Sequence, residues 1–515
     1  MTEQFTHEEI KALAPYVSNI DRPAFVVQNL PEEVVAVLFA YYSRSKESLR
    51  RNLLKLLVDQ DLDLKARVVV AQDDDAKLAS AKEKAKQFHE KWVVGYGHAS
   101  VAEHAIAHIA IEDVSIVASK IIEDNRLASF TEKSTRYVVF DPEKYYQAPE
   151  LRSTQFSKLY HATISAMMKK YAELTPLAID EIKRRIPQRQ GQTNLAYNAA
   201  CRAQACDLLR YILPAATFTN IGLTINGRAL EHLITKMLSY PLPEAQEFAA
   251  AIKQEAASVI PTLLKYANYN AFIDETNRQM SRIADELMNS QTTFDAMSKS
   301  ETKQNSVTLV HYDKGADDKL VAAILYEYTH ANALQVEAHV QLMTREQKER
   351  VIDEYLKRRD KWDEPLRALE HISYTFDILV DYGAFRDIQR HRMATQTNQL
   401  LSNAHGYETP QEITDYGYAK VFTELVERGG EAYEKMAADF PYQAQYVLPL
   451  AYRKRAMFTW NLRSLHHFIN LRSAKQGHVS YRDIAQKIYH EIAHVHPLLA
   501  RYIRVDLESY QMARA

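Results

Sequence analysis

The chain has 515 residues, of which 46% are hydrophobic and 25% are charged, a composition typical of a folded globular protein. This length exceeds that of one ordinary domain, so two or three domains are expected. The formal net charge of −2 gives no electrostatic reason to expect a nucleic acid or an anionic membrane as the main partner.

The cysteine content and the apolar runs bear on the compartment. The chain has only two cysteines, Cys201 and Cys206, which provide no disulfide framework. No signal peptide is visible at the amino terminus, and no stretch approaches the ~20 apolar residues that a membrane span needs. We therefore expect a cytoplasmic protein.

Apolar spacing in the first half predicts helices over 34–57 and 73–91, and alternation predicts strands over 104–112 and 134–140. Between the second helix and the first strand lies a glycine turn, Gly95-Tyr-Gly97-His98, followed by Ser100 and Glu103-His104. Ser and Glu three residues apart are typical of a helix capping box. The same side chains could equally be ligands or catalytic groups.

The remainder of the chain is mostly helical by its spacing. Predicted helices continue through 151–185, 194–213 and 243–265. A polar stretch follows, and residues 271–304 are the best linker candidate. A strand over 306–312 then opens the second half, with predicted helices over 316–331 and 345–359.

A basic triplet, Arg390-His391-Arg392, stands out in the second half. Burying three adjacent donors, two of them permanently charged, is costly without an anion, and arginine forks match phosphate oxygens. A solvated basic turn is the alternative. A degenerate copy of the stretch at Asp124-Asn125-Arg126 favours the phosphate site.

The two copies belong to a longer internal repeat. Leu448-Pro449, Asn461, Arg463 and His467 each follow an identical residue by 235 positions. Their counterparts are Leu213-Pro214, Asn226, Arg228 and His232. Conserved order and spacing across so many positions indicate a duplication, and two similar units would pack about a pseudo-two-fold axis.

These motifs resemble those of the flavin-dependent thymidylate synthase family. The family pattern runs Gly-His-x-Ser-x-x-Glu-His, then Arg-His-Arg-x-x-Ser-x-Asn-Glu-x-Ser-x-Arg-Tyr, and later Asn-x-Arg-Ser-Leu. The resemblance covers most of 90–140, 205–265 and 365–505. It implies an α+β protein of two tandem repeats, each a small antiparallel sheet packed with several helices, arranged as a pseudo-dimer. The predicted units are 1–270, with extra helical material at about 145–205, and 305–515.

The two halves depart from the family pattern in complementary ways. The first half has Asp124-Asn125 in place of Arg-His but keeps Arg136 and Arg210. The second half keeps Arg390-His391-Arg392 but has Gln445 in place of the arginine before the Leu-Pro pair. One site assembled from both halves could therefore be complete while its counterpart is lost.

The resemblance also implies roles for individual residues. The expected substrate-binding residues, for dUMP, are Ser134, Thr135, Arg136, Arg210 and Arg472. The expected catalytic residues are Arg472, Glu132 and His104. The expected FAD-binding residues are Arg390, His391, Arg392, Asn461, Arg463, Ser100, Arg126, Asn226 and Arg228.

The implied reaction is the reductive methylation of dUMP to dTMP, with FAD as cofactor and with NADPH and methylenetetrahydrofolate as co-substrates. The family also implies a homodimer of this chain that forms a pseudo-tetramer. No metal is expected in that reaction.

Two other functions are open. The eroded motifs are compatible with a non-catalytic relative that binds a flavin or a nucleotide. A remote alternative is a zinc metallopeptidase, because His490, Glu491 and His494 form a His-Glu-x-x-His pattern on a predicted helix.

Overall fold

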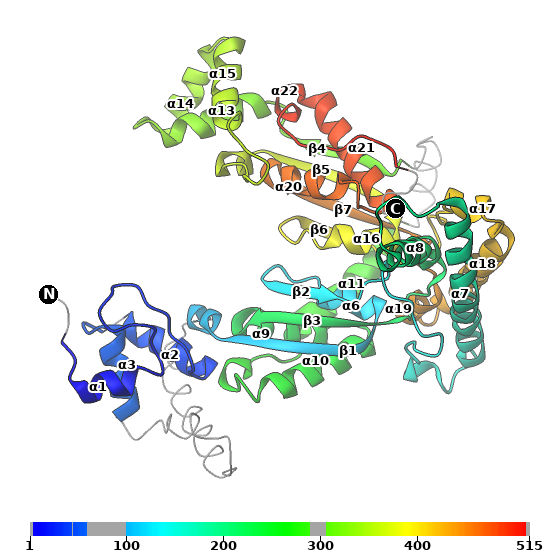
Figure 1. The fold of residues 1–515 in the computed structure, drawn as a ribbon, viewed down its shortest axis with the longest axis horizontal. Helices are drawn as coiled ribbons and strands as arrows, with labels where there is room; N and C mark the ends of the chain where they lie inside the picture. Colours follow the sequence, from blue (N-terminus) through cyan, green and yellow to red (C-terminus); the bar gives the residue numbers. More distant parts are fainter. Residues whose placement is uncertain (1–3, 44, 59–98, 289–304, 511–515) are drawn as a thin grey trace. The chain divides into compact units, whose positions relative to one another are not determined.

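The computed structural model describes residues 4–43, 45–58, 99–288 and 305–510 (Figure 1). The helix predicted over 73–91 and the Gly95–His98 turn lie outside these residues. The chain forms two compact units. Unit 1 contains Met1–Glu112, Ile121–Glu132 and Asn220–Asn289, and unit 2 contains Asp113–Lys120, Lys133–Thr219 and Ser290–Ala515. The units therefore differ from a simple cut between 1–270 and 305–515.

The sheet of the first repeat has three strands, in the order β1 (Ile106–Ser115), β3 (Phe218–Asn226), β2 (Ala128–Glu132). Strands β2 and β3 are antiparallel, with Ala128 opposite Ile225. The associated helices are η2 (Ala99–His104), α6 (Ile116–Ile122), α9 (Gly227–Leu238), α10 (Pro243–Ala256), η5 (Thr262–Leu264) and α11 (Ala271–Met288). The predicted linker thus begins with an α-helix, α11.

The amino-terminal part of unit 1 has a small hydrophobic core of its own. It contains α1 (His7–Leu13), α2 (Glu32–Tyr42) and α3 (Leu49–Val58). The single helix predicted over 34–57 is therefore two helices.

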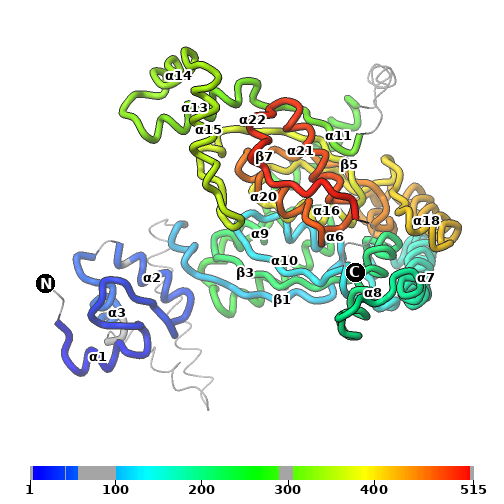
Figure 2. Tube along the Cα trace, turned by 45° about the horizontal axis from the view of Figure 1, so that its top comes forward, coloured from blue at the N-terminus to red at the C-terminus, as the bar shows by residue number. Residues whose placement is uncertain are grey.

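The sheet of the second repeat lies in unit 2 and has four antiparallel strands. Their order is β4 (Val307–Tyr312), β5 (Ser373–Asp381), β7 (Arg453–Asn461), β6 (Thr395–Asn398). Helices α16 (Tyr382–Gln389), α20 (Leu462–Ser473) and α21 (Val479–Val495) pack against it (Figure 2). This arrangement buries Phe376, Phe458 and Trp460 between the sheet and the helices.

Unit 2 also holds helices from both repeats. Those of the first repeat are η3 (Pro149–Leu151), α7 (Ser157–Arg185), α8 (Asn194–Leu209) and η4 (Arg210–Ile212). Those of the second repeat are α13 (Ala316–Glu327), α14 (Ala333–Leu342), α15 (Arg345–Leu356), η6 (Arg367–His371), α17 (Gln411–Asp415), α18 (Ala419–Ala437), α19 (Pro441–Ala444), η7 (Gln445–Val447) and α22 (Pro497–Ala500). Helix α7 packs against α18, so the extra helices of the first repeat are joined to the second.

The two Leu-Pro pairs meet in unit 2 and hydrogen-bond to each other symmetrically. The Ala215 N–H donates to the Leu448 carbonyl and the Leu450 N–H to the Leu213 carbonyl, both at 2.9 Å. Residues 213 and 215 of the first repeat correspond to residues 448 and 450 of the second, 235 positions later. The two hydrogen bonds are therefore equivalent, as in the isologous contact of a symmetric dimer. Strands β3 and β7 also share one pattern of buried and exposed residues. The α+β tandem fold is confirmed.

The prediction of a strand over 134–140 is wrong. The strand of this region is β2, which ends at Glu132, and the chain then turns. The Ser134 hydroxyl accepts a hydrogen bond from the Arg136 N–H at 3.2 Å, which closes the turn locally. The apolar residues Tyr137, Val138 and Val139 are exposed rather than paired in a sheet.

No helix in the described part of the chain is both long enough and apolar enough to cross a membrane.

Candidate functional site

Unit 2 brings together arginines from both repeats. Arg136 lies in the turn after β2, and Arg210 follows the end of α8. From the second repeat, Arg390 follows α16 and Arg472 lies in the last turn of α20. Arg210 is 1% exposed, and the side chain of Arg472 is also largely buried. The structure thus brings together the predicted substrate-binding residues of the two halves.

Asp387 of α16 lies between these arginines without making a close pair with any of them. Its carboxylate oxygens are 3.7 Å from Arg210 Nη1, 3.8 Å from Arg472 Nη1 and 3.9 Å from Arg390 Nη1. All three separations exceed hydrogen-bond length. The buried Nε and Nη2 of Arg210 have no hydrogen-bond partner among the described residues. Buried donors in this state favour an anion that can accept their hydrogen bonds.

Arg136 is in a different situation. Its Nε donates to Asp207 Oδ1 at 2.9 Å and its Nη2 to Asp207 Oδ2 at 3.3 Å, a two-pronged ion pair. Its Nη1 donates to the Tyr481 hydroxyl at 2.5 Å, and its Nη2 also donates to the Gln476 carbonyl. The guanidinium is therefore held by Asp207, by Tyr481 of α21 and by the Gln476 carbonyl just before that helix.

Charged side chains of both signs meet in this cluster. Its basic side chains are Arg136, Arg210, Arg386, Arg390 and Arg472, and its acidic ones are Asp207, Asp381 and Asp387. Burial would raise the pKa of Asp387, but Arg390, Arg210, Arg472 and Arg136 hold that pKa below its ordinary value. Arginine side chains that lower the pKa of a buried carboxylate are also chemically suited to a phosphate dianion.

His391 is a neutral hydrogen-bond acceptor in this cluster. Burial, Arg472 and His467 lower the pKa of His391 well below its usual range. Arg472 Nε donates to His391 Nε2 at 2.8 Å, which requires the imidazole proton to be on Nδ1. The ring also packs edge-on against Phe468. The Arg472 Nη2 donates to the Asp387 carbonyl at 2.6 Å, so α16 orients this arginine.

The remaining predicted FAD-binding residues of the second half have intramolecular partners. Asn461 accepts from the Ser464 N–H and caps α20. Arg463 donates to Glu370 Oε1 and to the Pro365 carbonyl, both at 2.7 Å. Arg390 is exposed, and Arg392 is partly exposed.

In unit 1 the first-half counterparts repeat this pattern. Asn226 caps α9, and Arg228 pairs with Glu103 at 2.6 Å, as Arg463 pairs with Glu370. Asp124, which stands where the family has arginine, pairs with Lys236. Ser100 and Arg126 are exposed.

The other predicted site residues are more dispersed. His104 is exposed in unit 1 and stacks on Phe39, and Glu132 ends β2 in the same unit. Thr135 is buried in unit 2, where its hydroxyl accepts from Arg386 Nη1 at 3.4 Å. Neither His104 nor Glu132 belongs to the unit that contains the arginine cluster.

The His490–His494 pattern is helical, as predicted, and lies on α21. Across the described ranges there is no group of three histidine, cysteine, aspartate or glutamate side chains placed to hold a metal ion.

Sequence reasoning missed Asp207, Asp387, Arg386 and Tyr481. Asp387 and Arg390 are three residues apart on a helix, as are Asp207 and Arg210, and this spacing is a recognisable ion-pair signal. Nothing in the sequence indicated that Asp207 would instead pair with Arg136, because that contact depends on how α8 meets the turn after β2.

The chain is similar to one described protein family, to curated proteins and to solved structures. The profile of the family described as "Thymidylate synthase complementing protein" matches residues 53–262 and 308–498. A UPF0159 protein of Chlamydia pneumoniae is 32% identical over 520 residues, covering 99% of this chain and 97% of the relative. A flavin-dependent thymidylate synthase of Thermococcus onnurineus is 30% identical over 155 residues, 30% of this chain and 54% of that protein. A solved structure of the Helicobacter pylori flavin-dependent thymidylate synthase with FAD and dUMP has a TM-score of 0.30 and 19% identity, covering 39% of this chain and 100% of the other.

The family profile matches both halves of the chain. The chain therefore belongs to the thymidylate synthase complementing protein family, which is the flavin-dependent thymidylate synthase family that its motifs resemble.

Proposed function

We propose that this protein is an FAD-dependent thymidylate synthase-like methyltransferase that converts dUMP to dTMP at one composite site per chain. The observation that carries the proposal is the buried arginine cluster of unit 2, to which both repeats contribute. Arg210, from the first repeat, and Arg472, from the second, both lie within 4 Å of Asp387. Arg210 would bind the phosphate of dUMP, and Arg472 would reach its pyrimidine.

The counterparts of these residues support a single site per chain. Gln445 stands where the first repeat has Arg210, and Met237 stands where the second repeat has Arg472. Gln445 uses its side-chain oxygen to accept from the Leu401 N–H, and Met237 is fully buried. A charge-assisted hydrogen bond contributes roughly 1.5–3 kcal/mol, so losing the equivalent arginines would remove most of the affinity for a nucleotide.

Of the predicted FAD-binding residues of the second half, some are exposed enough to bind a flavin, and others hold neighbouring residues in place. Arg390 and Arg392 offer guanidinium groups suited to a diphosphate; Arg390 is exposed and Arg392 is partly exposed. Asn461 and Arg463 are engaged in the cap of α20 and in the pair with Glu370, so they would orient the site rather than bind directly. When bound and reduced by NADPH, FAD would supply the hydride that completes the methyl group.

The chain's own contribution would be position and charge. Arg210 and Arg136 would anchor the phosphate end, with Arg136 fixed by Asp207. Arg472 would stabilise negative charge that develops on a pyrimidine carbonyl as methylenetetrahydrofolate delivers the one-carbon unit. Its orientation comes from the neutral His391 and the Asp387 carbonyl.

The test starts with the purified protein and its flavin absorbance. We expect dUMP to perturb the flavin spectrum, and NADPH with methylenetetrahydrofolate to yield dTMP. Arg210→Gln and Arg472→Met copy the residues of the counterpart positions and should each weaken dUMP binding at least tenfold. Arg345→Gln, on the exposed surface of α15, is the matched control and should leave binding unchanged. Unchanged dUMP affinity in both cluster variants would contradict the composite site.

A second candidate is a non-catalytic relative that binds a flavin or a nucleotide. The hydrogen bonds that Arg136 donates to Asp207 and Gln476 favour this non-catalytic function. A guanidinium that already donates these bonds has fewer donors left for a substrate phosphate. This candidate predicts a flavin spectrum that responds to dUMP without any dTMP being formed.

A further inference from the structure

Tyr481, in the first turn of α21, contacts arginines from both repeats and is 3% exposed. Its hydroxyl accepts a hydrogen bond from Arg136 Nη1, and the guanidinium carbon of Arg136 lies 5.3 Å from the centre of its ring. The guanidinium carbon of Arg472 lies 5.2 Å from the same centre. One tyrosine therefore touches both the arginine expected at the phosphate end of dUMP and the arginine expected at its pyrimidine.

This contact lowers the cost of bringing two buried cations together. Two guanidinium groups repel each other, and their burial is costly because they leave water. The face of an aromatic ring attracts both groups, and a tyrosine hydroxyl can accept a hydrogen bond from a guanidinium. Burial lowers the pKa of Arg472, and Asp387 and then Tyr481 oppose that shift. Tyr481 therefore favours the charged form of Arg472.

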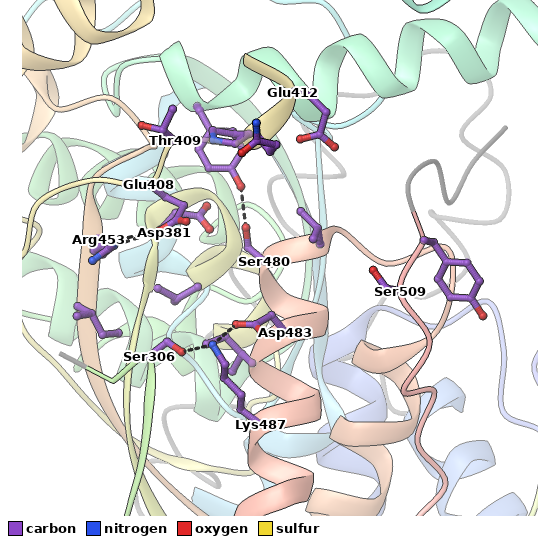
Figure 3. A pocket seen from close by; sticks show the side chains of 18 of the residues that line it. Ser306, Asp381, Glu408, Thr409, Glu412, Arg453, Ser480, Asp483, Lys487 and Ser509 are labelled. Atoms are coloured by element: carbon purple, nitrogen blue, oxygen red, sulfur yellow. Dashed lines mark hydrogen bonds and ion pairs between the residues drawn. The ribbon is translucent and has the colours of Figure 1, made fainter. Parts of the chain in front are cut away.

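The backbone that carries Tyr481 is tied to the first repeat at two further points. Ser480 lies in the wall of a cavity of about 1250 Å³ (Figure 3), and its hydroxyl shares a hydrogen bond of 2.6 Å with the hydroxyl of Tyr211 in η4. The Gln476 carbonyl, just before α21, accepts from Arg136 Nη2 at 3.3 Å. The start of α21 is thus held against the part of the first repeat that supplies the arginines.

The ring of Tyr481 fits in this place because residue 477 is a glycine. A methyl group at Gly477 would lie 2.8 Å from Tyr481 Cε2 and 2.9 Å from the carbonyl oxygen of Ala474. An aromatic ring is rigid and the carbonyl belongs to the backbone, so neither could move aside without disturbing its surroundings. The segment before α21 is therefore shaped to admit this ring.

The counterpart position in the first repeat lacks such a residue. Helices α10 and α21 begin 236 positions apart, which aligns Tyr481 with Ala245. Ala245 has neither a ring nor a hydroxyl, and Met237 stands where the second repeat has Arg472. The tyrosine and the arginine are thus present together in one repeat and absent together from the other.

We propose that Tyr481 is a positioning residue that couples the two repeats by holding Arg136 and Arg472 at the separation that a pyrimidine nucleotide requires. This inference rests on the proposed function, which assigns the two arginines to the two ends of dUMP. The hydroxyl holds Arg136, and the ring holds both guanidinium groups. Loss of the hydroxyl should therefore act on nucleotide binding, whereas loss of the ring should also act on the chemical step.

The experiment measures the affinity for dUMP by calorimetry and kcat by dTMP formation, in the full-length protein with its flavin. Tyr481→Phe removes only the hydroxyl and should weaken dUMP binding roughly tenfold, with kcat changed less than about twofold. Tyr481→Leu also removes the ring, and kcat should fall roughly tenfold in addition. Tyr489→Phe, partly exposed further along α21, is the matched control and should change neither quantity.

A measurement without ligand separates this inference from the proposed function. Arg136→Lys and Arg472→Lys should shift the thermal midpoint of unfolding non-additively in the wild type, because both arginines contact one ring. This coupling should shrink in a Tyr481→Leu background. If the wild type binds no dUMP or forms no dTMP, the proposed function fails, while the coupling still tests the role of Tyr481.

Two results would overturn the inference. One is a dUMP affinity that stays at the wild-type value in both Tyr481→Phe and Tyr481→Leu. The other is a coupling between the two arginines that is undiminished without the ring. If Tyr481→Leu does not fold, Gly477→Ala displaces the ring while keeping its hydroxyl, and undiminished coupling in that background has the same consequence.

Discussion

At the scale of single residues, Arg136 and Arg210 were both predicted to bind the substrate dUMP, but they lie in different environments. Arg136 is held by Asp207, Tyr481 and a backbone carbonyl, whereas two buried nitrogen atoms of Arg210 find no hydrogen-bond partner within the described residues. Their residue type and order in the motif could be recognised from the sequence. Their difference could not, because the partner of Arg136 on α21 is 345 positions away.

Asp387→Asn tests the charge balance around the cluster. The substitution removes a buried negative charge among the arginines, so we expect the thermal midpoint of unfolding to fall and the affinity for inorganic phosphate or dUMP to rise. Breaking one side of a buried ionic network costs roughly 3–5 kcal/mol. Phosphate should therefore restore more stability to the variant than to the wild type. An affinity for phosphate no higher than that of the wild type would show that Asp387 does not compete with the anion.

Glu33, in unit 1, should make stability depend on pH. Its carboxylate is 3% exposed and accepts from the Thr262 N–H at 2.9 Å. Burial raises the pKa of Glu33 to about 7, although backbone hydrogen bonds oppose this shift. Because the folded pKa is raised, the unfolded state ionises first, and stability falls as the pH rises from about 4.5 to about 7.

Glu33→Gln removes this ionisation. We expect the wild type to lose roughly 2–3 kcal/mol of local stability between pH 5 and pH 8, and the variant to lose much less. Hydrogen exchange of the α2 amides at the two pH values measures the difference. Glu32→Gln, on the preceding residue of the same helix, is the control.

At the scale of elements, the repeat is visible in helix caps. Asn226 and Asn461 have nearly the same backbone angles, φ −80° and ψ 160° against φ −79° and ψ 160°, and each side chain accepts from an N–H three residues on. Helix periodicity, asparagine caps and the Asn-x-Arg motif could all be predicted from the sequence. The strand predicted over 134–140 could not be corrected without the fold, because alternating apolar residues there are exposed beside the cluster instead of paired.

Asn226→Ala and Asn461→Ala should destabilise their helices equally. Loss of such a cap costs roughly 0.5–2 kcal/mol, and the matching geometry gives no reason for one to cost more. Hydrogen exchange in α9 and α20 provides the measurement, and the Asp variants, which can still cap, provide the controls. A loss of FAD binding in Asn461→Asp with α20 intact would assign that amide a direct role in binding.

At the scale of the whole molecule, the compact units do not follow the repeats. Residues 133–219 of the first repeat share unit 2 with the second repeat, joined through the Leu-Pro hydrogen bonds, α7 against α18, and Arg136 with Tyr481. The cluster therefore exists only when both repeats are present.

A protease site engineered between residues 289 and 304 tests this arrangement. We expect the two fragments to stay together in gel filtration after cleavage, because they share the hydrophobic core of unit 2. Asp207→Ala, which removes the carboxylate partner of Arg136, should make the cleaved pair dissociate at lower denaturant concentration. Immediate separation of the wild-type fragments would contradict the shared core.

The sequence by itself determined the duplication, the α+β class, the family and the complementary loss of motifs, because spacing and residue type are properties of one chain read in order. Only the tertiary structure decided which arginines face one another and which of them pair with the chain's own aspartates. The physical reason is that ion pairing and desolvation depend on distance in space. The decisive contacts join residues tens to hundreds of positions apart, from Arg136 and Asp207 to Arg136 and Tyr481.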